Sequence, residues 1–337
     1  MSRERLAVAV VGLGVGEQHA RAIVANEACR LAALVDIDPR RANALAAALP
    51  CRPPVRSFDE MLADPAIGLV VLASYDDAHA EQVVAALDAG KHVFVEKPLC
   101  RTGAELARIR HAWRRHGGRV RLASNLVLRA APLYRWLRDE AASGGLGQLY
   151  AFDGDYLYGR LSKITDGWRG DMPGYSVMAG GGVHLVDLMM WICGERPRRV
   201  RAVGNGICTR GTAFRQADFV AATFAFASGL VGRVTAHFGC VHRHQHVVRV
   251  FGTAASVVHD DAGARISRER DPAPAAPLRE LPDRERHKGA LIAPLVEAIL
   301  AGRDPDPATR HDLDVMAACI AADESLRSGH DEEVGYA

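Results

Sequence analysis

The amino-acid sequence predicts an α/β domain built on a parallel sheet, followed by an α+β domain with a largely antiparallel sheet. In the first 125 residues, short apolar runs alternate with segments of helical periodicity, as in crossover units on a parallel sheet. Later, long strand-like runs follow one another closely, which is typical of antiparallel sheets. The 337 residues also exceed what one hydrophobic core normally serves, so we expect two domains, 1–125 and 126–337.

Strands and helices are assigned along the chain from these patterns. In the first domain we expect strands at 6–11, 31–35, 68–73, 92–95 and 120–123, with helices at 17–26, 39–49, 78–89 and 104–115. In the second we expect strands at 149–158, 200–206, 219–227, 230–237 and 246–251, with helices at 133–142, 182–193, 291–301 and 313–327. The stretch 268–286 is rich in proline and charge and is predicted to be an exposed loop.

Composition argues against several classes of protein. A hydrophobic content of 49% and a charged content of 24% are ordinary for a soluble globular protein, and a net charge of +2 does not favour nucleic-acid binding. No run reaches the roughly 18 apolar residues that a membrane span needs. The seven cysteines are scattered and form no CxxC motif, which fits reduced thiols in the cytoplasm.

A glycine cluster follows the first predicted strand. Gly12, Gly14 and Gly16 stand between that strand and a helix, where backbone N–H groups bind the pyrophosphate of a dinucleotide. Asp36 ends the second strand, where a carboxylate accepts hydrogen bonds from a ribose diol and repels a 2′-phosphate. The first domain is therefore predicted to be a Rossmann domain that binds NAD, with NADP possible because Arg40 and Arg41 follow. Gly16 comes one residue earlier than usual, so either the turn is tighter or Gly16 is not the helix-packing glycine.

Several motifs together resemble the Gfo/Idh/MocA oxidoreductases. They are His19-Ala20 after the glycines, AGKHVFVEKP at 89–98, GGGVHLVDLMMW at 180–191, and Arg129 and Pro132 followed by the glycines of 144–147. The resemblance covers essentially the whole chain and keeps the order of the motifs. It implies a Rossmann domain followed by a domain whose open sheet often forms a dimer interface. Members mostly oxidise or reduce a carbon of a sugar, nucleotide sugar or cyclitol with NAD(P).

The resemblance also implies roles for individual residues. Lys97 hydrogen-bonds the reacting oxygen, and its peptide bond to Pro98 is expected to be cis. Hydride transfer from an alcohol does require a proton acceptor. His184 is the second acid/base group or a ligand of a substrate hydroxyl, and Asp187 one turn later orients it. The alternatives are a solvated strand end for Lys97 and a merely satisfied buried histidine for His184.

Further residues complete the predicted site. The candidate cofactor-binding residues are Gly12, Gly14, Val15, Gly16, Asp36, Ile37, Arg40, Ser74, Tyr75, His79, Glu96 and Lys97. The candidate substrate-binding residues are Asn125, Arg129, Tyr156, Tyr158, Trp168, Arg169 and His184.

Two positions depart from the family pattern. Gly180 stands where members that act on cyclitols typically carry an aspartate four residues before the histidine; Tyr156 and Tyr158 either supply a hydroxyl in its place or are core or interface residues. Residues 74–79 read SYDDAH where relatives usually have a Thr-Pro-Asn type of turn, which leaves the nicotinamide-ribose contact undefined.

A row of potential ligands occurs later in the chain. Cys240, His242, His244 and His246 alternate along the sequence, and in an extended strand they would share one face. The row is a metal site only if other segments contribute ligands; otherwise it contacts substrate or a second subunit, or is a plain polar face. We expect no metal, because the nicotinamide supplies the redox step.

The predicted function is therefore an NAD(P)-dependent oxidoreductase acting on a secondary alcohol or ketone carbon of a sugar-like ring. A nucleotide sugar is slightly favoured, because an aspartate is missing at Gly180 and because Arg129, Arg160 and Arg169 are basic pocket candidates. The alternatives are a free cyclitol or aldose dehydrogenase, and a non-enzymatic NAD(P)-binding sensor. We expect a homodimer or homotetramer formed through the second sheet.

Overall fold

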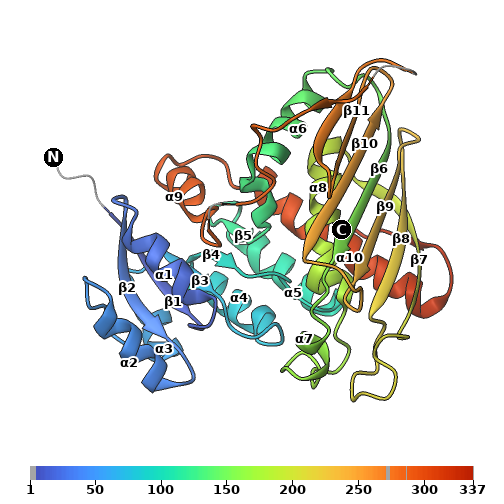
Figure 1. Ribbon diagram of the computed structural model, residues 1–337. Coiled ribbons are helices and arrows are strands. Elements are labelled where there is room, and N and C mark those ends of the chain that lie inside the picture. The colour runs from blue at the N-terminus through green and yellow to red at the C-terminus, as the bar shows by residue number, and fades with distance from the viewer. Residues whose placement is uncertain (1–4, 271–273, 286, 337) are drawn as a thin grey trace. The chain divides into compact units, whose positions relative to one another are not determined.

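The computed structural model of the chain describes residues 5–270, 274–285 and 287–336. They fall into two compact units (Figure 1): unit 1 comprises residues 1–127 and 286–313, and unit 2 comprises residues 128–285 and 314–337. The sequence-based division gave all of 126–337 to the second domain. It differs from the structure because residues 286–313 return to unit 1.

Unit 1 contains a parallel sheet with the strand order β2-β1-β3-β4-β5, as predicted. The first three strands have fully buried residues such as Val8, Val71 and Leu34, since helices pack on the sheet. The strands are β1 (Leu6–Val11), β2 (Cys29–Val35), β3 (Leu69–Leu72), β4 (His92–Val95) and β5 (Leu122–Ser124).

Side-chain caps define where several helices of unit 1 begin. Asp38 accepts a hydrogen bond from the Arg40 N–H, and Ser57 and Thr102 each form a capping box with the glutamate three residues later. The helix after Ser57 has six residues, too few for a periodic pattern, so its capping box was its only sequence signal. The helices are α1 (Gly16–Val24), α2 (Pro39–Ala48), α3 (Phe58–Ala63), α4 (His79–Asp88), α5 (Gly103–Arg115) and α9 (Ile292–Leu300).

Helix α9 belongs to unit 1 because its apolar face completes that core. Ile292 and Val296 lie four residues apart, are 1% and 0% exposed, and pack in one cluster with Val8, Leu34 and Phe94. A segment from the end of the chain therefore closes a core that the beginning of the chain starts.

Unit 2 is a nine-stranded sheet, within the described ranges, covered by helices. The strand order is β13-β12-β11-β10-β6-β9-β8-β7-β14, and all neighbours are antiparallel except the β6–β9 pair. The strands are β6 (Leu149–Leu157), β7 (Pro197–Asn205), β8 (Phe219–Phe226), β9 (Val231–His237), β10 (Gln245–Gly252), β11 (Ser256–Asp260), β12 (Gly263–Ser267), β13 (Ala276–Pro277) and β14 (Glu332–Glu333).

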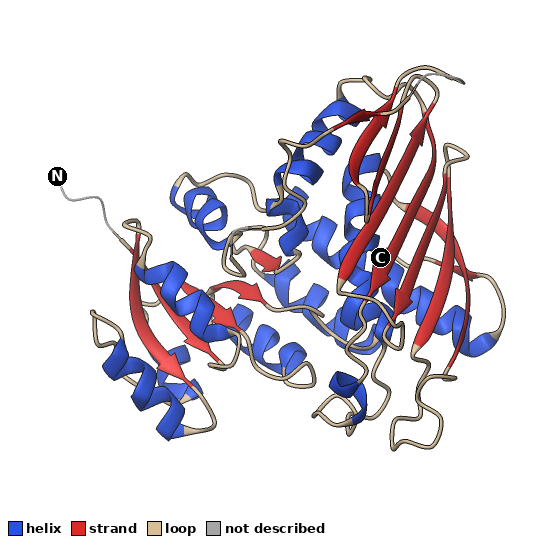
Figure 2. Cartoon of the chain, in the orientation of Figure 1, coloured by secondary structure: helices blue, strands red, loops and turns tan. Residues whose placement is uncertain are grey.

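The helical segments of unit 2 lie on one side of its sheet (Figure 2). The π-helix η2 (Met178–Gly182) leads directly into α8 (Val183–Cys193), which packs on β6. Helix α10 (Asp306–Ser328) starts in the residue range of unit 1 and continues into that of unit 2. The remaining segments are the 3₁₀ turn η1 (Val127–Ala130), α6 (Pro132–Ala142) and α7 (Ser162–Thr165).

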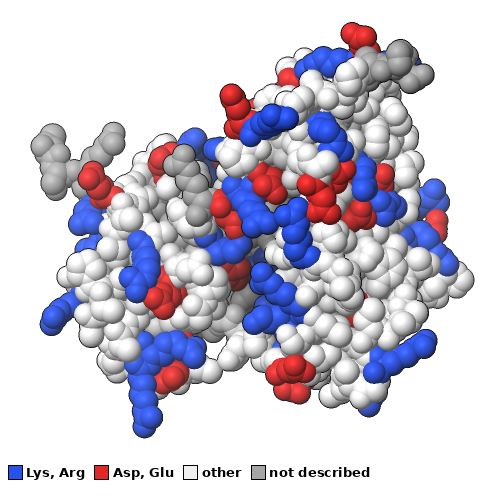
Figure 3. Space-filling model, in the orientation of Figure 1, with Lys and Arg blue, Asp and Glu red and all other residues white. Residues whose placement is uncertain are grey.

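The two faces of this sheet differ in chemistry because side chains alternate along β6. Phe152 and Tyr156 are buried on the helix side, whereas Asp153 and Asp155 point the other way. On that second face Arg233 pairs with both aspartates, and Arg249 pairs with Asp155 at 3.0 Å. In Figure 3, basic and acidic side chains are interspersed over these strands.

Some predicted boundaries were wrong. Helix α10 begins at Asp306 rather than at 313, and the predicted loop 268–286 contains β13, which pairs with β12. Residues 271–273 and 286 of that loop lie outside the described residues. Among the described residues, no helix is both long and apolar enough to span a membrane.

Substitution of Val296 by alanine tests the assignment of α9. We expect Val296→Ala to reduce the free energy of unfolding by about 1–3 kcal/mol, because it opens a cavity in the core of unit 1. Leu300→Ala on the same helix is the control, since Leu300 is 49% exposed. Thermal unfolding followed by circular dichroism distinguishes them; equal melting temperatures for both variants would contradict the assignment.

Candidate active site

Most predicted residues of unit 1 lie at the carboxyl ends of the parallel strands. The glycine loop follows β1, Asp36 follows β2, Ser74 lies just after β3, and Glu96 follows β4. In the order β2-β1-β3, the crossover direction reverses between β1 and β3, and ligands of such sheets bind at that point. Unit 1 therefore gathers these candidates at one edge of its sheet.

The glycines of the loop have distinct functions. Gly12 has φ +79°, and a Cβ there would lie 2.5 Å from the Ser74 backbone nitrogen, so only glycine fits. A Cβ on Gly14 would meet nothing within 4 Å, which leaves space beside the loop. A Cβ on Gly16 would lie 3.1 Å from Val10 and 3.2 Å from Ala73. Gly16 is thus the glycine that lets α1 pack closely on the sheet, despite its early position.

Asp36 joins the glycine loop to the end of β2. Its carboxylate accepts hydrogen bonds from the Leu13 N–H at 2.6 Å and the Asp38 N–H at 2.8 Å, and its side chain is only 3% exposed. The Arg41 guanidinium lies 3.9 Å away. The next residue, Ile37, is 89% exposed. A carboxylate therefore lies at the place where a Rossmann domain binds the ribose of NAD.

Glu96 is the centre of a buried polar network. It accepts hydrogen bonds from the Asn125 amide at 2.7 Å, and its carboxylate lies 2.8 Å from His19 Nε2. Burial alone would raise the pKa of Glu96, but the His19 contact, the Asn125 hydrogen bond and the nearby Lys97 charge lower it to about 2. The carboxylate is therefore ionised at neutral pH, beside the lysine predicted to transfer the proton.

Two atoms of this network fit a bound group. His19 Nδ1 and Asn125 Oδ1 are buried and have no hydrogen-bond partner among the described residues, a costly state unless a ligand or water completes it. With the open space at Gly14, they fit a cofactor lying along this edge. His19 appeared in the sequence only as part of a motif and was not among the candidate residues.

His79 fixes the two turns that carry Ser74 and Lys97. It is fully buried, with Nδ1 2.7 Å from the Pro98 carbonyl and Nε2 3.3 Å from the Ser74 carbonyl. The Lys97–Pro98 peptide is cis, as predicted. Tyr75, by contrast, is 48% exposed. Direct contact of His79 or Tyr75 with a cofactor stays a prediction.

The predicted residues of unit 2 centre on the start of α8. His184 occupies its first turn, after the π-helix, a feature frequent at functional sites. Asp187 is fully buried and forms a bidentate ion pair with Arg129, with Nε–oxygen distances of 3.0 and 2.9 Å. The Arg129 guanidinium is thus held by protein, and the orientation of His184 by Asp187 stays a prediction.

An aromatic–imidazole cluster surrounds His184, consisting of Tyr156, Tyr158, Tyr175, His184, Phe238, His244 and His246. Tyr156 is its centre, with ring centroids 6.3 Å from His184, 5.4 Å from His246 and 5.6 Å from Tyr158. Burial raises the pKa of Tyr156, so its hydroxyl stays protonated at neutral pH. The structure therefore brings Tyr156 to His184, with Tyr158 stacked on Tyr156.

The prediction that the row from Cys240 to His246 shares one face was wrong. Strand β10 begins only at Gln245, and residues 238–244 form an irregular loop. His242 pairs with Asp261 at 3.0 Å and Cys240 contacts the His237 carbonyl, while His244 joins the cluster. Among the described residues, no group of three or more His, Cys, Asp or Glu side chains could hold a metal ion.

The structure explains the glycine at position 180. A Cβ on Gly180 would overlap the hydroxyl of Tyr175, which is 5% exposed and belongs to the cluster. The position therefore cannot carry a carboxylate while Tyr175 keeps this conformation. Sequence analysis missed Tyr175, because only the fold brings its hydroxyl against Gly180.

Trp168 and Arg169 pair with each other. The Arg169 guanidinium lies 4.2 Å from the centroid of the Trp168 ring, and that of Arg160 lies 5.3 Å from Tyr158. Each cation is thus placed over an aromatic face, and substrate contact by Trp168 or Arg169 stays a prediction.

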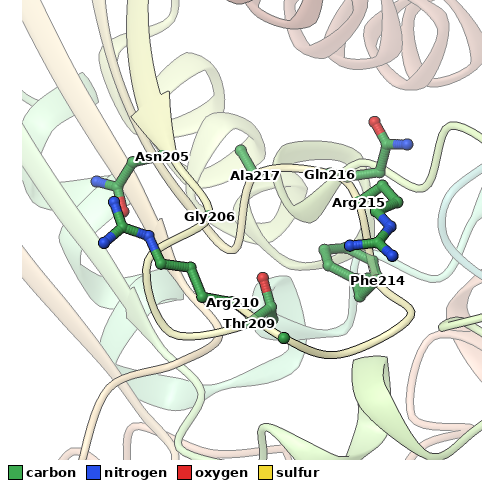
Figure 4. Close-up of a pocket in the computed structure, with 9 residues that line it drawn as sticks. Asn205, Gly206, Thr209, Arg210, Phe214, Arg215, Gln216 and Ala217 are labelled. Atoms are coloured by element: carbon green, nitrogen blue, oxygen red, sulfur yellow. The ribbon is translucent and has the colours of Figure 1, made fainter.

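The loop between β7 and β8 forms a cavity of about 430 Å³ (Figure 4). Phe214 is buried there, and its ring centroid lies 6.2 Å from that of Tyr175, so the loop adjoins the cluster. Figure 4 shows Arg210 and Arg215 at opposite sides of this cavity, which gives no single point where both would bind one anion. None of the lining residues was predicted from the sequence.

Comparisons with protein families match both units. Residues 6–124 match an oxidoreductase family with an NAD-binding Rossmann fold, and residues 134–258 match the GFO/IDH/MocA C-terminal domain. The first domain is thus an NAD-binding Rossmann domain, in agreement with its glycine loop and Asp36.

Two curated relatives share 30% identity with parts of the chain. One is inositol 2-dehydrogenase of Acidothermus cellulolyticus, over 200 residues that cover 59% of this chain and 56% of that protein. The other is 1,5-anhydro-D-fructose reductase of Ensifer adhaerens, over 225 residues that cover 64% of this chain and 61% of that protein. The chain thus matches less than two thirds of the length of either relative.

Solved structures share the whole fold. An oxidoreductase domain protein from Kribbella flavida has a TM-score of 0.85 at 23% identity, and covers 98% of this chain and 100% of its own. Levoglucosan dehydrogenase, in complex with NADH and levoglucosan, has a TM-score of 0.85 at 22% identity with the same coverage. At these identities the likeness shows the fold alone.

Gly12 and Gly14 should respond differently to alanine. Gly12→Ala puts a Cβ on a residue with a left-handed backbone, which costs about 1–2 kcal/mol of folding free energy. The Cβ would also collide with the Ser74 backbone. We therefore expect a lower melting temperature and the loss of NADH binding. Gly14→Ala has space and should leave the melting temperature within about 2 °C. Melting curves and NADH fluorescence titration check this; equal melting temperatures for both variants would be inconsistent with the loop geometry.

The overlap of position 180 with Tyr175 predicts coupled substitutions. Gly180→Ala should destabilise the protein by about 1–3 kcal/mol, because its Cβ must displace a buried ring. In a Tyr175→Leu background the same substitution should cost clearly less. A double-mutant cycle of unfolding free energies measures this coupling, and strict additivity would refute the overlap.

Proposed function

Because the chain belongs to the Gfo/Idh/MocA oxidoreductase family, we propose that it is an NAD-dependent oxidoreductase acting on a CH–OH carbon of a free cyclic polyol, a cyclitol or a simple sugar. The observation that carries this proposal is Lys97. It follows β4 at the edge that also bears the glycine loop, directly after the ionised Glu96 and before a cis peptide bond.

The substrate class follows from the relatives and from the arginines. The named relatives act on inositol and on an anhydrosugar, and the nucleotide sugar favoured by sequence analysis finds no support among them. Arg129, one of the reasons for that preference, is held by Asp187, and Arg160 and Arg169 lie over aromatic rings. A free polyol is therefore the better proposal.

The mechanism uses this chain's residues for binding and proton transfer. The glycine loop and Asp36 would hold a bound NAD, which would supply the redox step. Lys97, as the neutral amine, would take the hydroxyl proton on Nζ as the carbonyl forms and so become an ammonium group. In the reverse direction that ammonium group would return the proton to the oxygen. Glu96, ionised and tied to His19 and Asn125, holds the segment that carries Lys97. His184, in the first turn of α8, is the proposed ligand or second acid/base group for the substrate.

Two copies of the chain are proposed to associate through the face of the unit 2 sheet that no helix covers in Figure 2. That face carries the Arg233–Asp155–Arg249 ion pairs, and the same sheet has Tyr150 and Val231 about half exposed, at 53% and 48%. Arginine and tyrosine are among the residue types enriched at protein interfaces, which supports this face as the contact surface.

Lys97→Met tests the function directly. We expect kcat to fall by about 10²–10⁴-fold with NADH affinity nearly unchanged, because the variant loses proton transfer but keeps the glycine loop. Reduced-nicotinamide absorbance with NAD against cyclitols, aldoses, anhydrosugars and nucleotide sugars is the measurement. Lys163→Met, at an exposed lysine of α7, is the matched control.

Two results would contradict the proposal. Full turnover by Lys97→Met would remove this lysine from the chemistry. Tight NADH binding by the wild type without turnover of any compound in the panel would favour a nicotinamide-binding sensor instead.

A further inference from the structure

Three rings at the start of α8 form a triangle within unit 2. The centroids of Tyr156, His184 and His246 are separated by 6.3 Å, 5.4 Å and 6.0 Å. Their positions follow from the sheet, because His246 on β10 lies directly opposite Tyr156 on β6 in the antiparallel ladder. His184 approaches the same pair from α8. The predicted acid/base histidine thus has a second imidazole as a neighbour.

A further imidazole extends the triangle. The His244 ring lies 4.9 Å from His246, 4.9 Å from Tyr158 and 5.3 Å from Tyr156. His244, His246 and Tyr158 are half-buried, whereas Tyr156 and His184 are buried. The cluster therefore has a partly accessible side formed by two histidines and a tyrosine.

The pattern along β10 indicates that these histidines do more than fill space. On the same face, the next two pairs of the ladder are Val248 with Gly154 and Val250 with Phe152, where the valines are buried and apolar. The row becomes polar only at His246, next to His184. A packing function alone could be served by another valine, so the two histidines at this end of the strand indicate a different function.

The chemistry of the cluster suits an uncharged polyol. A neutral imidazole and a tyrosine hydroxyl each donate and accept hydrogen bonds, as alcohol groups do, and the ring faces pack against C–H groups. The nearest fixed charge that the contacts place at the cluster is the Arg160 guanidinium, 5.3 Å from the centroid of the Tyr158 ring.

We propose that His246, with His244 beside it, is a specificity-determining residue that binds a ring hydroxyl next to the one bound by His184. This inference rests on the proposed function and deepens it. With its ring centroid 6.0 Å from that of His184, His246 selects the configuration of a neighbouring carbon of the same ring. The catalytic step stays with Lys97 and the nicotinamide.

The experiment compares His246→Phe with His242→Phe. His246→Phe keeps an aromatic ring but loses both nitrogens, and His242→Phe is the matched control because His242 faces Asp261 outside the cluster. Each purified full-length variant is assayed with NAD against myo-inositol, scyllo-inositol and pairs of aldoses that differ at one carbon. Melting temperature and NADH affinity are recorded alongside.

For His246→Phe we expect at least a tenfold rise in KM for the best substrate and at least a tenfold change in the kcat/KM ratio between epimers. NADH affinity should stay within twofold of the wild type, and His242→Phe should match the wild type throughout. A folded His246→Phe with unchanged KM and epimer ratios would overturn the inference and leave the proposed function intact. If His246→Phe melts early, His246→Gln is judged by the same thresholds.

Failure of the proposed function itself looks different. In that case the wild type shows no turnover, and calorimetry of its NADH complex with each polyol shows no binding. That result would overturn both proposals before any variant is compared. Binding of polyols that His246→Phe weakens at least tenfold, even without turnover, would support the inference.

Discussion

The ionised carboxylate of Glu96 is the constraint on which the site of unit 1 depends. It joins α1, through His19, and the residue after β5, Asn125, to the end of β4, so one largely buried charge connects three segments that are distant in sequence. It also accepts a hydrogen bond from the N–H of the adjacent Lys97. Removal of any partner would leave a buried charge less compensated, which costs more than the lost hydrogen bond alone. The position of the proposed proton-transfer lysine is therefore a consequence of local electrostatics.

In unit 2, the register of the strands determines which side chains lie together on each face of the sheet. Pairing of Tyr156 with His246 and of Gly154 with Val248 sets an aromatic–imidazole face under α8, while the intervening aspartates face the other way and pair with arginines. A shift of one residue would exchange the two faces. The same alternation thus separates the surface suited to polyol binding from the surface suited to association of subunits.

Much of the fold could be predicted from the sequence, because buried parallel strands are short apolar runs between helices of clear periodicity. The site at the ends of β1–β4 followed from the glycine loop, Asp36 and Glu96-Lys97. Features that depend on distant neighbours could not be predicted. The overlap of Tyr175 with Gly180 is a tertiary contact, and the bond between Arg129 and Asp187 joins residues 58 positions apart. The prediction for the row from Cys240 to His246 was wrong because every second residue can be a potential ligand in a loop as well as in a strand. The sequence alone does not show which of the two forms.

The return of α9 to the core of unit 1 has a consequence for how the chain folds during synthesis. The residues of β1 and β2 in this core emerge early from the ribosome, but Ile292 and Val296 emerge only after all of β6 to β13. Until then the early sheet exposes the apolar surface that α9 covers, and exposed apolar surface promotes aggregation. The nucleotide-binding unit therefore cannot be separated from the rest of the chain by a single cut. A fragment that ends near residue 127 would lack α9 and leave part of its core exposed.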